Sequence, residues 1–275
     1  MLTLISSTFN QIPAFLPLAF AVYISFFILR ATDMTLDGSF VLGAAVFAKL
    51  TEIGLSDIAL PAALLSGMLA GMGVALIQHH KKIDPLLAGI LATFILISIN
   101  LIIMGRPNIS LLSQTSNQII ITLYSINFCA LVSLLLLSRH GLLLRAFGDN
   151  ENLLQRLGKS VEMHRIFGFA LTNCLAALSG CLTAQTVGYA DIGMGFGVTL
   201  TALGAVILGK QLLSKYKIKI AGEFLISLTG VLFYFFAINS LLRLDLNPIY
   251  LKMVLGIILI IFLRTAKISS QTRPA

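Results

Sequence analysis

Two acidic residues stand beside a short apolar run, and their surroundings make them the first candidates for chemistry. Asp33 and Asp37 lie four residues apart, and Gly38 and Ser39 follow directly. Acidic side chains inside a membrane are costly and usually functional, whereas at a membrane edge the same carboxylates would cap a helix. Gly38 and Ser39 would let the end of a broken helix approach a bound molecule. From the residues alone, helix capping and the lining of a membrane pathway both stay open.

Amide side chains form a second group of polar residues within apolar sequence. Asn100, Asn173 and Asn239 each lie inside an apolar run. An amide in hydrocarbon needs a hydrogen-bond partner, most often on a neighbouring helix, so contact between helices is the favoured interpretation of all three. Asn100 is kept as a pathway candidate, together with Gly197, which lies at the start of a second short apolar run.

Residues that serve in catalysis or metal binding do not gather into a recognisable site. His79 and His80 are adjacent, so on a helix they would point apart, and no cysteine or acidic ligand accompanies them. Cys174 and Cys181 would lie about 10 Å apart along a helix, too far for a disulfide. The chain has no glycine-rich nucleotide loop of the form G-x-x-x-x-G-K-[ST]. We therefore expect no enzyme activity, no metal and no cofactor in this chain, and any driving ATP hydrolysis on another chain.

The composition is that of a membrane protein. Hydrophobic residues make up 57% of the 275 residues and charged residues only 11%, whereas soluble domains average about 25% charged residues. Nine apolar runs divide the chain, at residues 12–30, 36–50, 58–78, 85–104, 118–138, 166–187, 196–209, 220–240 and 249–264. Most approach the length of about 20 residues that a span needs, but 36–50 and 196–209 are short. We predict an all-α polytopic bundle with about nine membrane segments (eight to ten), forming one transmembrane domain over residues 1–275.

The connecting segments alternate between basic and weakly charged. The basic ones are 78–82, 139–165, 210–219 and the tail from 264; the others are 51–57, 105–117, 188–193 and 241–248. Because Lys and Arg favour cytoplasmic loops, we predict an outside N-terminus and a cytoplasmic C-terminus. The same placement in short loops argues against nucleic-acid binding, although the net charge is +8.

The two short runs resemble each other. Residues 37–46 and 197–206 share a loose pattern of small and apolar residues, and in the predicted topology they run in opposite directions. Paired short, glycine-interrupted segments indicate an inverted repeat with a substrate path between its halves. Packing of small residues between helices would produce the same pattern.

The basic loop 139–165 contains a predicted helix from Asp149 to Gly158. The Asp149 carboxylate is a good N-cap, Glu151 suits the positive end of the helix dipole, and Gly158 can adopt the left-handed conformation that ends a helix. The apolar positions, which fall on one face, are Leu153, Leu154 and Leu157. A helix this short is marginal in water, so this face needs a partner, either the lipid surface or a soluble protein.

Here the sequence resembles the permeases of branched-chain amino acid and sugar type ABC importers, and within them the subfamily linked to uptake of aromatic (tryptophan-type) amino acids. The segments that carry the resemblance are 145–151, 157–160, 170–180, 188–189, 204–209 and, at the other end, 32–39. The resemblance implies a non-catalytic, multi-pass permease subunit of the bacterial inner membrane that imports a small polar nutrient, with an amino acid favoured. It implies a second permease copy, a periplasmic or lipid-anchored binding protein, and an ATPase subunit that holds ATP and Mg²⁺.

The resemblance also assigns residues. In the family a short loop helix docks into the ATPase, and the matching residues here are Arg145, Asp149, Asn150, Glu151, Leu153, Leu154, Leu157 and Gly158. The chain departs from the family pattern at Lys210–Leu213, where larger members have a glycine-rich turn. Two alternatives remain: a secondary transporter driven by an ion gradient, which would need buried ionisable residues, and a membrane component of an ABC system that does not carry nutrients.

Overall fold

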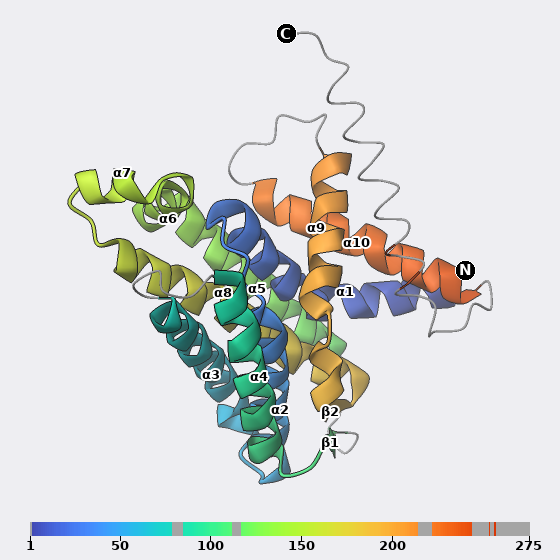
Figure 1. The fold of residues 1–275 in the computed structure, drawn as a ribbon. Helices are drawn as coiled ribbons and strands as arrows, with labels where there is room; N and C mark the ends of the chain where they lie inside the picture. Colours follow the sequence, from blue (N-terminus) through green and yellow to red (C-terminus); the bar gives the residue numbers. More distant parts are fainter. Residues whose placement is uncertain are drawn as a thin grey trace.

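The computed structural model describes residues 2–78, 85–111, 117–213 and 222–243, together with Met253 and Gly256. Within these residues the chain forms a helical bundle with one small β-ribbon (Figure 1). In chain order the elements are α1 (Leu2–Tyr23), the π-helix η1 (Ile24–Ile28), α2 (Thr35–Glu52), α3 (Ser56–Ile77), α4 (Pro85–Met104), β1 (Asn108–Ser110), α5 (Gln118–Leu137), α6 (Arg139–Asp149), α7 (Glu151–Arg156), α8 (Val161–Val187), β2 (Tyr189–Asp191), the 3-10 helix η3 (Ile192–Gly195), α9 (Val198–Leu212) and α10 (Gly222–Arg243).

The predicted membrane bundle is confirmed. Seven helical stretches of the described residues are long and apolar enough to cross a membrane. Eight of the predicted runs correspond to α1–α5 and α8–α10, and the ninth, 249–264, lies almost entirely outside the described residues. The short run 36–50 becomes α2, which is not one of the seven spans because Asp37, Lys49 and Glu52 lie near its ends.

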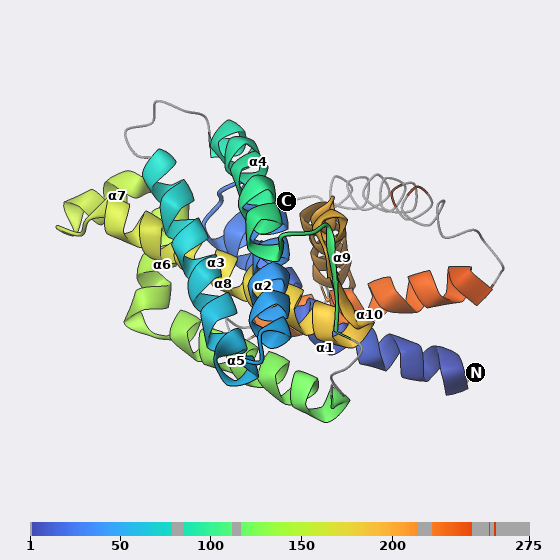
Figure 2. The same cartoon turned by 90° about the horizontal axis from the view of Figure 1, so that it is seen from below.

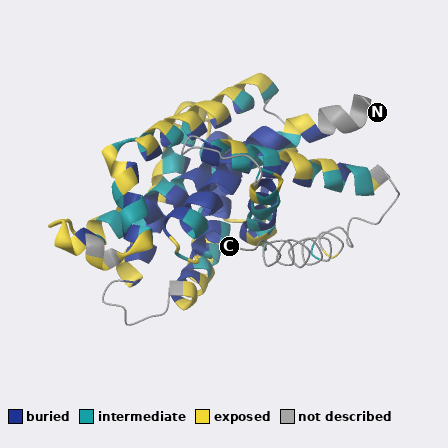
Figure 3. Ribbon diagram, turned by 90° about the horizontal axis from the view of Figure 1, so that it is seen from above, coloured by how far each residue is buried: buried dark blue, intermediate teal, exposed yellow. Residues whose placement is uncertain are grey.

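Helices α1, α2 and α8 form the centre of the bundle, and the others surround them. In the most apolar stretch of α8, 72% of the residues are buried, against 28% in α3, α4, α5 and α10. Figure 2 shows α2 and α8 between α4 on one side and α5 on the other. Figure 3 shows the same division, with buried residues in the middle and exposed residues at the edges. The outer helices expose large apolar side chains such as Ile102 and Leu134, as expected of helices that face lipid.

Glycines bring the central helices into close contact. A Cβ atom on Gly43 of α2 would lie 2.0 Å from the Ala177 carbonyl oxygen, and one on Gly180 of α8 would lie 1.8 Å from that of Phe40. Small residues at such crossings let helix backbones approach in a membrane, where apolar burial between helices supplies little driving force.

Contacts between connecting segments sort them to two ends of the bundle. At one end, Arg106 pairs with Glu52, and β1 pairs with β2 in an antiparallel ribbon. At the other end, Arg165 donates to the Gln78 carbonyl, and α6 and α7 lie on the side of the bundle away from the ribbon (Figure 1). Among the described residues, the weakly charged connectors 51–57, 105–111 and 188–193 therefore share one end and the basic connector 139–165 lies at the other, in agreement with the predicted alternation.

Candidate functional site

The second membrane helix begins inside the bundle. After η1 the chain is not helical until Thr35, and Asp33 in this connector is 0% exposed. One Asp33 carboxylate oxygen accepts hydrogen bonds from the Thr35 backbone N–H, at 2.9 Å, and from the Thr35 hydroxyl. The Thr93 hydroxyl, in the middle of α4, donates to the Met34 carbonyl at 2.9 Å. Asp33, one residue before the N-cap Met34, thus satisfies the first backbone N–H of α2, and this helix start lies beside the middle of α4.

Asn173 of α8 organises the polar groups around this start. Its Nδ2 donates to the second Asp33 oxygen at 2.9 Å and to the Phe169 carbonyl at 2.9 Å. Its Oδ1 accepts from the Ser39 hydroxyl at 2.6 Å and lies 3.2 Å from the Thr35 hydroxyl. The predicted helix-to-helix role of Asn173 is confirmed. Because Asp33, Ser39 and Asn173 are all fully buried, these bonds compensate for their removal from water.

Asp37 caps a different helix from its own. Its carboxylate accepts from the Gly197 backbone N–H at 3.0 Å and from the Thr199 N–H at 2.7 Å, at the start of α9. Gly197 has φ +72°, a left-handed conformation that favours glycine. A carboxylate also suits the positive end of the α9 dipole. Both acids therefore bond backbone N–H groups at helix starts, and Asp37 joins α2 to α9.

Asn100 and Gly38 complete the cluster. Asn100 Nδ2 donates to the Gly38 carbonyl at 3.2 Å, and its Oδ1 has no hydrogen-bond partner among the described residues. A Cβ on Gly38 would lie 2.8 Å from Leu96, so the glycine lets α4 pack against the α2 start. The structure thus brings together all the predicted pathway residues around the starts of α2 and α9. We call this cluster the central joint; it comprises Asp33, Asp37, Gly38, Ser39, Asn100, Asn173 and Gly197.

The two similar segments, residues 37–46 of α2 and 197–206 of α9, meet at this joint. From it, α2 runs to Glu52 at the end that carries the ribbon, whereas α9 runs to Lys210, whose ammonium lies 4.2 Å from the centroid of the Phe27 ring of η1 at the basic end. The two short helices therefore begin side by side and leave in opposite directions. This is the arrangement that an inverted pair of broken helices would give.

A cavity of about 340 Å³ lies next to the joint. Phe40, one turn after Asp37, and Val198 of α9 are among its lining residues, and none of those residues is charged. Phe15 and Tyr234 stack on another part of the wall, with ring centroids 6.1 Å apart. The full lining is Gln11, Ala14, Phe15, Phe40, Thr183, Thr186, Val187, Tyr189, Met194, Val198, Tyr234, Phe235 and Ile238. Such a lining suits an apolar or aromatic group.

The polar loop differs from its prediction at the helix start. Asp149 is the last residue of α6 and forms a 2.6 Å ion pair with Arg30, and both side chains are 62% exposed. Asn150 instead caps α7, since its side chain accepts from the Asn152 N–H at 2.9 Å. The predicted helix 149–158 is thus wrong in its N-cap. α6 also packs on η1: a Cβ on Gly148 would lie 1.9 Å from the Ile28 carbonyl oxygen.

The predicted leucine face is divided between the core and the surface, whereas the predicted helix end is confirmed. Leu154 is fully buried in the protein core, but Leu157 is 58% exposed, so they do not share one free face. The side chains of Glu151 and Leu153 lie outside the described residues. Gly158 has φ +68°, and the Lys159 N–H donates to the Leu154 carbonyl at 3.0 Å, which closes the helix as a Schellman motif.

The Arg145 side chain is mostly buried and points into the protein. Its guanidinium makes two hydrogen bonds to Glu223 of α10, at 2.5 and 3.2 Å. Lys219, four residues before Glu223 and the partner that helical spacing favours, lies outside the described residues. No local rule would have found this contact, because the partners are 78 residues apart.

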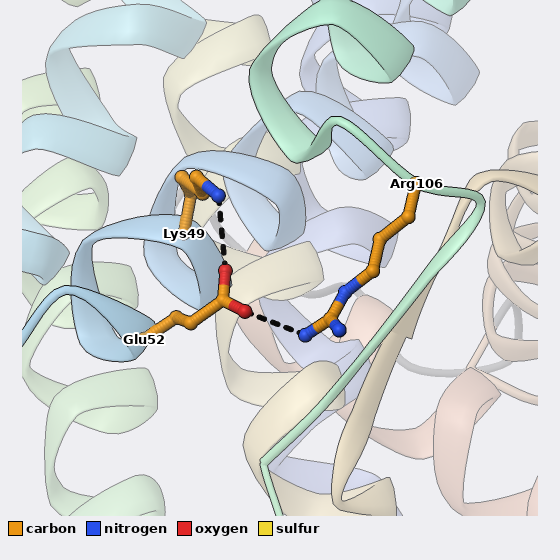
Figure 4. A network of polar contacts seen from close by, with 3 residues as sticks. All are labelled: Lys49, Glu52 and Arg106. Carbon is orange, nitrogen blue, oxygen red and sulfur yellow. Dashed lines mark hydrogen bonds and ion pairs between the residues drawn. The ribbon is translucent and has the colours of Figure 1, made fainter.

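At the opposite end, Glu52 bridges two cations (Figure 4). Its carboxylate lies 3.1 Å from the Lys49 ammonium and 2.6 Å from the Arg106 guanidinium. The hydrogen bond from Lys49, and then the charge of Arg106, lower the pKa of Glu52. This cluster links the end of α2 to the segment that leads into β1.

Comparison with known proteins gives the family. The profile of the family described as "Branched-chain amino acid transport system / permease component" matches residues 4–263. The chain belongs to this permease family. Members are non-catalytic subunits of ABC importers without a cofactor of their own, and ATP is hydrolysed on a separate chain.

Several curated relatives support the assignment. An uncharacterized protein of Rickettsia prowazekii (strain Madrid E) is 44% identical over 92% of this chain and 94% of its own length. A tyrosine transport system permease protein of Clostridioides difficile (strain R20291) is 34% identical over 92% and 88%, respectively. A ribose import permease protein of Haemophilus influenzae is 26% identical over 88% and 78%. No solved structure gives a significant match.

Proposed function

We propose that this permease carries an amino acid and that the central joint controls its passage. The observation that carries the proposal is the meeting of two helices that both begin inside the bundle and are joined through Asp37. In many transporters the starts of broken helices near mid-membrane border the substrate site. If the start of α9 separated from Asp37, α2 and α9 could move relative to each other. Such a movement could open one end of the bundle while the other closes, as alternating access requires.

A substrate with an aromatic or large apolar side chain is favoured. The cavity of about 340 Å³ beside the joint is lined by rings, including Phe15, Tyr234 and Phe235. The Thr183 hydroxyl on its wall has no hydrogen-bond partner among the described residues and is free to bind a polar group. The relative named as a tyrosine transport permease supports the same class of substrate.

The ATPase would bind the exposed end of α7. Asn152 and residues 155–160 are exposed, while Leu154 anchors the helix to the core. This surface lies at the basic end, which the charge rule places in the cytoplasm. Of the residues assigned to ATPase coupling, Asn150, Leu157 and Gly158 remain candidates for direct contact or for shaping the contact surface. Arg145, Asp149 and Leu154 would act by holding the segment in place.

The remaining features of the assembly follow the family. We propose one transmembrane domain over residues 1–275, in a homodimer in the bacterial inner membrane, with the C-terminus in the cytoplasm. A periplasmic or lipid-anchored binding protein would deliver the substrate to the end that carries β1 and β2.

A glycine substitution tests ATPase binding. Gly158→Pro removes the N–H that donates to the Gln155 carbonyl at 3.0 Å and imposes a negative φ where the structure has +68°. We expect the variant to insert into the membrane but to lose co-purification with the ATPase in mild detergent. Gly54→Pro is the matched control, because Gly54 has φ +88° in a connector at the other end. If Gly158→Pro still retains the ATPase and transports normally, the docking proposal fails.

An ion-driven transporter is the second candidate, favoured by the burial of Asp33. Its carboxylate is fully buried, and the hydrogen bonds found for it come from neutral groups of Thr35 and Asn173. Buried acids of this kind carry protons or cations in secondary transporters. Uptake into proteoliposomes by an imposed ion gradient, without ATPase or binding protein, would support this candidate against the importer.

A further inference from the structure

The Arg145–Glu223 ion pair differs from the other ion pairs of the described residues in its burial. Its side chains are 23% and 11% exposed, whereas those of Arg30–Asp149 are both 62% exposed. Two parallel hydrogen bonds fix the guanidinium against the carboxylate. Paired, partly buried contacts of this kind hold a defined geometry, which single exposed contacts do not.

The pair connects two parts of the molecule that are far apart in sequence. Arg145 lies on α6, which the backbone joins to α5 and, through α7, to α8. Glu223 lies in the first turn of α10. The pair therefore ties the polar segment to a membrane helix that the chain reaches only after α8 and α9.

From α10 the connection continues to the central joint. A Cβ on Gly209 of α9 would lie 2.1 Å from the Ile226 carbonyl oxygen, and one on Gly230 of α10 would lie 2.1 Å from that of Ala205. Backbones in such close contact shift together, because interiors are densely packed. The other end of α9 is held by Asp37 through the Gly197 and Thr199 amides. An unbroken series of contacts thus runs from α6 through α10 and α9 to α2.

We propose that Arg145 and Glu223 are positioning residues that transmit movement of the ATPase-binding segment to the α9–α10 pair, and so to the central joint. The proposal rests on the permease function proposed above. The start of α10 does not itself require Arg145, since a glutamate in the first turn of a helix is favourable without a partner. The pair therefore fixes where α6 sits relative to α10.

Charge reversal tests the pair. Arg145→Glu, Glu223→Arg and the double swap would be purified with the ATPase and reconstituted into proteoliposomes with the binding protein, using tyrosine as the probe substrate. Each single variant is expected to lower the number of substrate molecules transported per ATP hydrolysed by about tenfold or more, and the swap is expected to restore most of it. A purely structural role would instead lower the amount of assembled complex and leave this ratio unchanged.

The exposed pair Arg106–Glu52 provides the matched control, with the same reversals and swap at the other end of the bundle. We expect its variants to keep the wild-type ratio. The proposal is overturned if the Arg145 and Glu223 variants assemble and keep the wild-type ratio, if the swap does not recover it, or if the control reversals lower it equally. If the wild-type chain transports tyrosine without the ATPase, the proposed function is wrong. The proposed role of the Arg145–Glu223 pair, which depends on that function, is then wrong as well.

Discussion

Asp37→Asn is the sharpest test of the central joint. The aspartate carboxylate accepts two backbone N–H groups of α9, at 3.0 and 2.7 Å, with one oxygen each. An asparagine of the same shape has one acceptor oxygen and one N–H₂ group, so one amide of α9 would face a donor. Because the side-chain volume changes little, any loss of stability in the variant measures the contribution of the Asp37 carboxylate to the start of α9.

The expected magnitude follows from the lost interactions. One hydrogen bond to a charged acceptor contributes about 1.5–3 kcal/mol, and the carboxylate at the helix start adds about 0.3–1 kcal/mol. Together these give a loss of about 2–4 kcal/mol. For a chain of this size, each kcal/mol shifts Tm by about 2 °C or more, so we expect the apparent Tm in detergent to fall by at least about 4 °C.

Asp57→Asn is the matched control. Asp57 lies in the first turn of α3 and is exposed, so removing its charge should cost only the dipole contribution of about 0.3–1 kcal/mol. Because the chain has no tryptophan, thermal unfolding of both variants can be followed by thiol labelling of the buried Cys181. The difference between their Tm values measures the contribution of the Asp37 cap. A Tm for Asp37→Asn equal to that of Asp57→Asn would refute the role of Asp37 as the link between α2 and α9.

Further predictions concern the joint, the helix contacts and the Glu52 cluster. Asn173→Leu leaves the Asp33 and Ser39 side chains short of partners and should destabilise the protein by about 3 kcal/mol or more, seen as a lower yield of folded protein and a lower Tm. Gly180→Ala places a methyl group 1.8 Å from the Phe40 carbonyl oxygen, separates α2 from α8, and should lower Tm more than Gly73→Ala, where a Cβ meets open space. Because the pKa of Glu52 is lower in the folded protein than in the unfolded chain, its stabilising contribution is present above about pH 4.3 and is lost as the pH falls through the folded pKa. Glu52→Gln should therefore lose less stability than wild type on acidification over that range, as measured by Tm against pH.

The membrane helices and their alternation could be predicted because both depend on local composition. Apolar length fixes a span, and the placement of Lys and Arg fixes which connectors share an end. The convergence of the pathway candidates was also predictable in part. Polar side chains in an apolar helix need hydrogen-bond partners, and in a membrane bundle these are mostly other polar groups. Gly158 was predictable because the left-handed end of a helix selects glycine.

The partners of the polar groups could not be predicted in the same way. Asp149 and Asn150 are adjacent residues with similar ability to cap a helix. Asn150 caps α7, while the Asp149 carboxylate pairs with the distant Arg30. Leu154 and Leu157 differ in burial because only Leu154 lies against the core. The Asp37–Gly197 and Arg145–Glu223 contacts span 160 and 78 residues, so no local spacing reports them.

The capping of both broken helices has a consequence for how the joint would meet a substrate. The start of an uncapped helix attracts an anion through its free N–H groups and its dipole, and a substrate carboxylate would normally use such a site. Here the starts of α2 and α9 are already occupied by Asp33 and Asp37. A substrate carboxylate would meet these carboxyl groups instead of free amides. Binding of an amino acid carboxylate at either helix start requires the corresponding aspartate to leave it, and for Asp37 that departure also breaks the link between α2 and α9. Under the proposed function, entry of a substrate carboxylate would therefore accompany release of the α2–α9 link, and this would couple binding to a change of access.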